Sequence, residues 1–213
     1  MENQCDLKEI NIKIKRGFLD RQERLLIINP EFFQFENKDL VVDPHTRFDK
    51  NQITDYRFGI NWIRGFEFTI GREFQIFVRN FDKQVVKINF RSLYGIRRNE
   101  LHKLYSDIIK ALWKFYFDDI KSELLLNYKN DETIEINQVQ ISKRGVTIRT
   151  NEIFKGQDKT ITWDDLGVSL YETYFAIYSK KDAVDINRGY SYLKDWNSGV
   201  LYSVLSSIVN GKS

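Results

Sequence analysis

The chain has 213 residues, of which 42% are hydrophobic and 15% aromatic, a composition that indicates a folded protein and excludes a disordered one. Residues 1–120 carry 21 Lys and Arg against 18 Asp and Glu, an excess too small for a dedicated nucleic-acid-binding protein. Cys5 is the single cysteine, which excludes an internal disulfide and a Cys-based zinc cage. We see no signal-peptide pattern and no apolar run of about 20 residues, and we expect a cytoplasmic protein.

The first half of the chain reads as a series of short strands. Asn29-Pro30-Glu31 separates two apolar runs and predicts a hairpin turn, whereas the polar residues 38–50, which include Pro44, predict a loop. Further turns are expected at Arg64-Gly65, at Gly71-Arg72 and at residues 80–83. Strands are expected at residues 10–14, 25–28, 32–35, 53–63, 66–70, 74–78 and 85–90. Short strands at this spacing predict a meander that closes into a sandwich or barrel.

After Gly95 the hydrophobic period changes from that of strands to that of a helix. Apolar residues recur at i, i+3, i+4 and i+7 from Leu101 onward, and Asn99 is the expected N-cap. The pattern continues to about Leu126, which at 1.5 Å per residue is roughly 40 Å and longer than one small domain needs. We therefore expect its last turns to connect two domains, with the boundary in the polar residues 127–132.

The second half repeats the order of the first. Strands are expected at residues 139–141 and 146–148 around a turn at Lys143-Arg144-Gly145, then at 174–178 and 184–187, and a helix at 198–210 ends at Gly211. Residues 160–168 match residues 52–60, because both contain Ile-Thr, a carboxylate, an apolar residue, Gly and a β-branched residue. An internal repeat of this kind fixes the domain plan before any single residue is interpreted.

These patterns resemble the bacterial version of the pleckstrin-homology-like (PH-like) fold. The resemblance rests on the hairpin of residues 141–148, Ile-Ser-Lys-Arg-Gly-Val-Thr-Ile, followed by residues 161–166, Ile-Thr-Trp-Asp-Asp-Leu. It implies a mainly β protein with helices (α+β) made of two tandem PH-like units, at residues 8–128 and 133–213. Each would be a β-barrel or sandwich closed by a C-terminal helix, and a long helix would join them. Such domains bind lipids, peptides or proteins, so the fold leaves the function open.

A cluster of basic residues near the N-terminus is the first candidate site. Basic residues on the first two strands of eukaryotic PH domains grip inositol phosphates, and the resemblance implies a similar role here. Guanidinium and ammonium groups suit phosphate oxygens. The other interpretation is a solvated strand face on which Asp20 and Glu23 pair with the cations. The cluster comprises Lys13, Lys15, Arg16, Arg21 and Arg24.

Two aromatic segments are candidate interfaces with a partner. Trp62, Arg64 and Phe66 fall at an expected hairpin tip, and exposed aromatic residues beside Arg are typical of interface hot spots. The alternative is that one ring packs in the core. Trp113 and Phe117 belong to a run that is apolar on more than one helical face, which is compatible with contact with a second domain or subunit. A core stripe with one or two partly exposed rings is the equally weighted alternative.

No catalytic constellation is present in the sequence, and we expect no enzyme, metal or cofactor. We expect a non-catalytic binding or scaffold protein that contacts another protein or a second copy of itself. The alternative is peripheral binding to an anionic membrane lipid or a phosphorylated ligand through the basic cluster. No nucleic acid is expected. Abundant Lys, Asn and Ile, with only 2 Pro, are typical of an AT-rich bacterial genome.

Overall fold

The computed structural model describes residues 9–17, 19–36, 45–150 and 157–211, so that Cys5 and Pro44 lie outside the described residues. The protein is mainly β with helices, and all its sheets are antiparallel, which confirms the α+β class. The chain divides into two compact units, Met1–Asp118 and Asp119–Ser213.

The first unit begins with a four-stranded sheet in the order β1-β2-β3-β4. Its strands are β1 (Ile10–Ile14), β2 (Arg24–Ile28), β3 (Phe32–Glu36) and β4 (His45–Asp49). The prediction of a loop up to Lys50 was wrong, because residues 45–49 pair with all of β3. Phe48 is the one apolar residue of β4 and is buried beside Phe33, 6.2 Å between ring centroids. An edge strand needs only this one anchor, so its other side chains are polar.

A three-stranded sheet follows, in the order β5-β6-β7. After a short 3₁₀ turn, η1 (Lys50–Gln52), come β5 (Ile53–Arg64), β6 (Thr69–Asn80) and β7 (Val85–Leu93). The predicted turn at Gly71-Arg72 was wrong, since β6 runs through both residues. A Cβ on Gly71 would lie 2.3 Å from the carbonyl oxygen of Ser92, so this glycine permits close approach of β7.

One helical stretch runs from Arg98 to Lys129, close to the predicted length, and consists of α1 (Arg98–Leu112), a π-helical turn η2 (Trp113–Phe117) and α2 (Asp118–Lys129). The predicted N-cap Asn99 lies inside α1, and the cap is Arg97 in a left-handed conformation, with φ 55°. The π turn brings three consecutive rings into buried positions, which accounts for the aromatic run on more than one face. These rings belong to Phe115, Tyr116 and Phe117.

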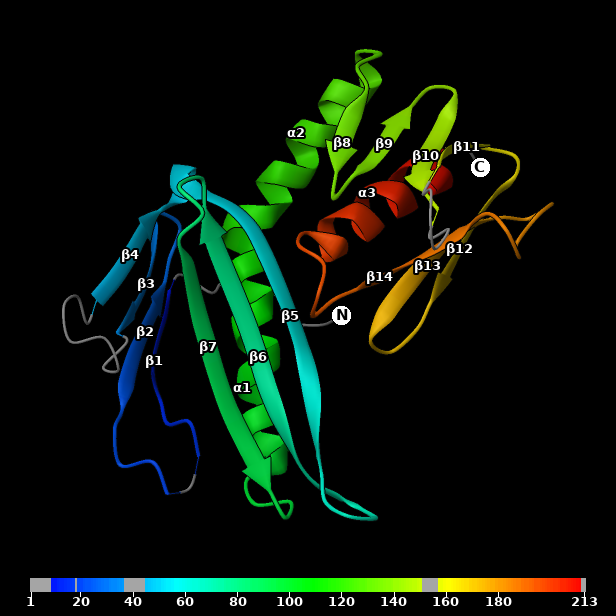
Figure 1. Ribbon diagram of the computed structural model, residues 1–213. Coiled ribbons are helices and arrows are strands. Elements are labelled where there is room, and N and C mark those ends of the chain that lie inside the picture. Colours follow the sequence, from blue (N-terminus) through cyan, green and yellow to red (C-terminus); the bar gives the residue numbers. More distant parts are fainter. Residues whose placement is uncertain (1–8, 18, 37–44, 151–156, 212–213) are drawn as a thin grey trace, which may run out of the picture. The chain divides into compact units, whose positions relative to one another are not determined.

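The core of the first unit lies between its two sheets and α1, which runs along the three-stranded sheet (Figure 1). Alternate residues of β6 and β7 point inward, and Phe74 contacts Phe90 and Tyr105 at centroid distances of 5.3 Å. The main-chain amide of Arg91 donates a 2.8 Å hydrogen bond to the carbonyl of Arg16, so β7 is tied to the end of β1. The residues with no exposed surface include Leu26, Ile28, Phe33, Phe74, Ile76, Val78, Ile88, Phe90, Ile108 and Leu112.

The second unit has the same order of elements as the first: a four-stranded sheet, a three-stranded sheet and a helix. The first sheet, in the order β11-β10-β9-β8, is followed by the sheet β12-β13-β14. The elements are β8 (Ile134–Ile136), β9 (Val139–Ser142), β10 (Gly145–Arg149), β11 (Asp158–Thr162), β12 (Leu166–Leu170), β13 (Tyr174–Ser179), β14 (Asn187–Ser191) and α3 (Ser198–Asn210). The helix at 198–210 is confirmed.

The strand predicted at residues 184–187 was wrong over residues 184–186, which form a turn, and β14 begins only at Asn187. The amide of Ile186 donates to the carbonyl of Asp182 at 3.0 Å, and the side-chain amide of Asn187 donates to the carbonyls of Ala183 and Val184. Local side-chain to main-chain bonds of this kind compete with strand formation. The alternation Val-Asp-Ile-Asn therefore does not produce a strand here.

The motif shared by the two halves has a structural explanation. Asp55, near the start of β5, accepts hydrogen bonds from Thr54 Oγ1 and Arg79 Nε, both at 2.8 Å. Asp165, just before β12, accepts a 2.6 Å bond from Ser179 Oγ and one from the amide of Lys181. Each carboxylate thus fastens the first strand of a three-stranded sheet to its neighbour or to the turn after it.

Candidate functional site

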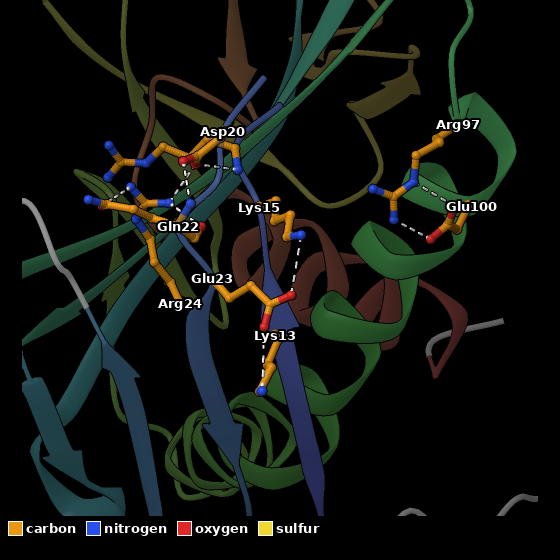
Figure 2. A network of polar contacts seen from close by, with 9 residues as sticks. Lys13, Lys15, Asp20, Gln22, Glu23, Arg24, Arg97 and Glu100 are labelled. Atoms are coloured by element: carbon orange, nitrogen blue, oxygen red, sulfur yellow. Dashed lines mark hydrogen bonds and ion pairs between the residues drawn. The ribbon is translucent and has the colours of Figure 1, made fainter. Parts of the chain in front are cut away.

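The basic cluster lies on β1, on β2 and on the connection between them, and much of it is paired internally. Lys13 Nζ and Lys15 Nζ approach the two carboxylate oxygens of Glu23, at 3.4 and 3.3 Å (Figure 2). Hydrogen bonds from Lys15 and then from Lys13 hold the pKa of Glu23 below its usual range. Both ammonium groups therefore already have a carboxylate partner.

Arg24 and Asp20 form the centre of the β1–β2 connection. Arg24 is 3% exposed, and its Nη1 lies 2.6 Å from Asp20 Oδ2. Asp20 also accepts main-chain amide bonds from Arg16 and Gln22, both at 3.0 Å. Burial alone would raise the pKa of Asp20, but these two amides and the Arg24 guanidinium outweigh it and lower the pKa to about 2. This ion pair holds the connection in shape and makes Arg24 structural.

A hollow of about 470 Å³ adjoins this connection and the outer face of β7. Of the five predicted basic residues, the structure brings Arg16 and Arg24 together here, with Asn89 and Arg91 from β7. Arg91 Nε is 2.9 Å from a carboxylate oxygen of Glu73. An anion would have to compete with these carboxylates, so the hollow is a weak candidate for a phosphate site. That the basic cluster binds a ligand stays a prediction.

Trp62 and Arg72 occupy opposite positions on the β5–β6 ladder. They continue an inward-facing row that includes Tyr56, but Trp62 is 37% exposed whereas Tyr56 is 2% exposed. The Arg72 guanidinium carbon lies 4.1 Å from the centre of the Trp62 ring, a cation–π contact. The alternative that this ring packs in the core does not hold for Trp62, which flanks the hairpin tip.

The β5–β6 turn carries two exposed rings, and one of them, Phe66, is the most exposed ring among the described residues of the first unit. Phe66 has a relative exposure of 106% and Phe68 of 66%, and Arg64 is also exposed. The amide of Gly65 donates a 2.7 Å hydrogen bond to the carbonyl of Phe68, which closes the turn. The rings are therefore held outward by the main chain, and no described side chain covers Phe66.

The β7–α1 turn adds two more exposed apolar residues, Tyr94 and Ile96, which are 74% and 45% exposed. The amide of Tyr94 donates to the carbonyl of Ile70 at 2.8 Å, which fastens this turn to the β5–β6 hairpin. Tyr94 and Arg98 line the same hollow of about 300 Å³ as Trp62 and Phe68. The two turns therefore form one continuous surface.

The β1–β2 connection lies at this same end of the first unit (Figure 1). Lys15 and Gly17 line a small hollow with Ile96 and Arg97 of the β7–α1 turn. Leu19, in the same connection, is 79% exposed. We call this surface the basic–aromatic end. It comprises the apolar residues Leu19, Trp62, Phe66, Phe68, Tyr94 and Ile96 and the cations Arg21, Arg64, Arg72 and Arg98.

Positive charge predominates among the unpaired groups of the basic–aromatic end. Arg97 pairs with Glu100, 2.8 Å from Nε to Oε2, and this contact raises the pKa of Arg97. Within the described ranges, no carboxylate forms an ion pair with the four arginines of the end, and Glu67 is the one anion at the tip without a cation partner. The end therefore presents a net positive charge around its apolar residues.

The residues of the predicted helix interface, Trp113 and Phe117, are more buried than those of the β5–β6 tip. Phe117 has no exposed surface and stacks on Tyr56 at a centroid distance of 3.9 Å. Trp113 is half-buried and lies edge-on to Tyr56, at 6.2 Å. Phe117 offers no surface to a partner, because it is part of the core, and we leave both residues out of the candidate site.

Sequence reasoning found Trp62, Arg64 and Phe66 but missed the rest of the apolar set. Tyr94 and Ile96 flank Gly95, which has a φ of 76°, and an apolar pair around a turn glycine was the signal available. Leu19 likewise follows Phe18 in an otherwise polar connection. These residues can be recognised as part of one surface only when the β1–β2, β5–β6 and β7–α1 connections are known to lie at the same end of the unit.

Comparison of the chain with protein-family models, with curated proteins and with solved structures gave no match. Within the described part of the chain, no helix has the length and apolar character needed to cross a membrane. The same residues contain no group of three or more His, Cys, Asp or Glu side chains that could hold a metal ion.

Proposed function

We propose that this chain is a non-catalytic binding protein and that its first unit binds through the basic–aromatic end. The observation that carries the proposal is the gathering of six exposed apolar side chains at one end of the unit, Phe66 among them at full exposure. Exposed apolar residues scattered singly are ordinary, but a contiguous set rimmed by polar groups marks an interaction surface.

The architecture we propose is two tandem PH-like units, residues 8–128 and 133–213, joined by a long helix in a cytoplasmic bacterial protein. The equal order of sheets and helix in the two halves supports this. In the first unit, the hydrogen bond from the Arg91 amide to the Arg16 carbonyl supports closure between the two sheets. A scaffold of this kind offers rigid loops at one end, which suits binding more than chemistry.

The energetics also favour an interaction surface at this end. Burying a fully exposed Phe contributes roughly 1.5–3 kcal/mol, so Phe66 and Phe68 together could supply several kcal/mol on contact with a partner. Little conformational entropy would be lost, because the Gly65–Phe68 hydrogen bond already fixes the turn. Trp62 beside Arg72 adds the residue types that dominate interface hot spots.

The test is photocrosslinking in living cells with benzoylphenylalanine in place of Phe66 or Phe68. The matched control is the same substitution at Phe81, which is 53% exposed in the β6–β7 turn at the other end of the same sheet. We expect covalent adducts, to protein or to lipid, from positions 66 and 68 and none above background from position 81. Equal labelling at all three positions, or none, would refute the proposal.

A further inference from the structure

We propose that the basic–aromatic end docks on the surface of an anionic lipid bilayer, with Phe66 and Phe68 inserted among the lipids and the arginines at the headgroups. This inference rests on the proposed function, since it names the partner of the same surface. It is carried by the arrangement of the apolar residues and by the charge around them.

The apolar residues of this surface come from three separate connections, and Phe66 at the β5–β6 tip is fully exposed. Leu19 comes from β1–β2, Phe66 and Phe68 from the β5–β6 turn, and Tyr94 and Ile96 from β7–α1. A protein partner would need a matching recess for each projection, since protein interfaces reach the packing density of interiors. A fluid lipid surface accepts separate projections without such recesses, so it fits this shape better.

The types of aromatic residue also fit a bilayer interface. Trp62 and Tyr94, whose rings carry a polar group, flank the tip, and the wholly apolar Phe66 is its most exposed residue. Trp and Tyr are enriched at membrane–water interfaces, where one part of the ring is apolar and the other hydrated. On the β5–β6 hairpin the apolar ring of Phe66 lies at the tip, and Arg64 and then Trp62, opposite Arg72, follow along β5.

The charge at this end selects an anionic surface over a neutral one. Arg64 and Arg72 adjoin the tip, and Arg98 lines the same hollow as Trp62 and Phe68. Among the described residues, none of these arginines is neutralised by a carboxylate. Juxtamembrane Lys and Arg are attracted to anionic lipids. By contrast, Lys15 and Arg24 are already paired with Glu23 and Asp20 and are not needed for docking.

The main test is co-sedimentation of the full chain with vesicles of phosphatidylcholine alone and of equal parts phosphatidylcholine and phosphatidylglycerol. We expect binding to the anionic vesicles only. Phe66→Asp should weaken this binding roughly tenfold to a hundredfold, as expected when an inserted Phe is lost. Phe81→Asp changes the net charge equally at the other end of the sheet and should leave binding within about threefold of the parent chain, a shift under 1 kcal/mol.

The charge contribution is tested with a second matched pair. Arg64→Gln with Arg98→Gln removes two positive charges from the end and should weaken binding by up to about 30-fold at low salt. Lys83→Gln with Lys110→Gln removes the same charge from exposed positions elsewhere in the unit and serves as the control. Binding of the parent chain should also fall as sodium chloride rises from about 20 to 150 mM, because salt screens exposed charges. Circular dichroism melting of every variant checks that folding is unchanged.

Two results would overturn the inference. One is absence of binding to anionic vesicles. The other is an equal loss of vesicle binding in Phe66→Asp and Phe81→Asp, which would indicate non-specific attraction of the protein to the vesicles. Protein adducts from position 66 in cells, combined with absence of vesicle binding, would leave the proposed function standing with a protein partner. Failure of both experiments would remove the basic–aromatic end as a binding surface.

Discussion

Substitution of Asp20 by Asn tests whether the β1–β2 connection is held by the ion pair of Asp20 with the buried Arg24. The carboxylate accepts hydrogen bonds from the Arg16 and Gln22 amides and from Arg24, at 3.0, 3.0 and 2.6 Å. Lowering of the Asp20 pKa from 3.8 to about 2 corresponds to about 2 kcal/mol of native-state preference for the charged form. Asn keeps one acceptor oxygen but loses the charge, and Arg24, which is 3% exposed, loses its 2.6 Å contact with the Asp20 carboxylate. We expect a loss of about 2 kcal/mol from the free energy of unfolding at pH 7.

The pH dependence of this effect has a definite sign. The folded-state pKa of Asp20 lies below its unfolded value, so the charged carboxylate stabilises the fold above about pH 4. The difference in stability between the parent chain and Asp20→Asn should therefore be constant from pH 5 to 7 and should shrink as the pH falls from about 4 to 2. Below the folded pKa of about 2, the carboxyl is neutral in both states and its charge no longer contributes.

The assay is urea denaturation of the full chain, followed by circular dichroism, for the parent and the variant at several pH values. With a slope of about 2 kcal/mol per molar urea, the midpoint at pH 7 should fall by about 1 M. Asp82→Asn, at an exposed position in the β6–β7 turn, is the control and should change stability by less than about 0.5 kcal/mol. A midpoint unchanged in Asp20→Asn, or a difference that grows towards pH 2, would refute this account of the connection.

Three further substitutions test other contacts of the fold by the same denaturation assay. Tyr116→Phe removes the hydroxyl that approaches two main-chain carbonyls of the β2–β3 turn, at 2.8 and 2.6 Å, and should cost about 1–2 kcal/mol. Gly71→Ala places a Cβ 2.3 Å from the carbonyl oxygen of Ser92 and should cost about 1–3 kcal/mol through displacement of β7. Trp163→Phe removes an indole N–H that donates to the carbonyl of Ser142 at 3.0 Å and should cost about 1 kcal/mol.

Each of these changes has its own contradicting result. Tyr94→Phe removes an exposed hydroxyl and should be neutral, so equal effects at positions 94 and 116 would contradict the role of the Tyr116 bonds. Gly17 has open space where a Cβ would lie, and Gly17→Ala should be tolerated, unlike Gly71→Ala. For Trp163→Phe, a change below about 0.5 kcal/mol would show that the carbonyl of Ser142 binds water instead.

Most strands were predictable from sequence because their hydrophobic period is strong. The alternation of residues 10–14 and the runs on either side of Pro30 produced β1, β2 and β3 near the expected positions. Strand β4 was missed because this five-residue edge strand contains one apolar residue, Phe48, which is buried. The division of β6 at Gly71 was wrong because glycine serves turns and close strand approach alike, and only the position of Ser92 on the neighbouring strand separates the two.

The basic cluster shows what charge patterning can and cannot predict. The segment contains five cations with two carboxylates among them, a pattern compatible with both a ligand site and a solvated face. In the structure, Glu23 lies between two lysines and Asp20 faces Arg24, so the pairs form within one connection. Pairing depends on side-chain direction at each turn residue, which periodicity does not specify.

The basic–aromatic end was only partly predictable because it is assembled from three connections far apart in the chain. Trp62 and Phe66 were visible as one hairpin tip, whereas Tyr94 joins them only because its amide binds the carbonyl of Ile70. Because β5, β6 and β7 are antiparallel neighbours, the β5–β6 turn and the last residues of β7 lie at the same end of the sheet. A candidate surface in a β-rich chain is therefore better sought by collecting apolar residues from the turns at one end of a sheet than by searching for a contiguous motif.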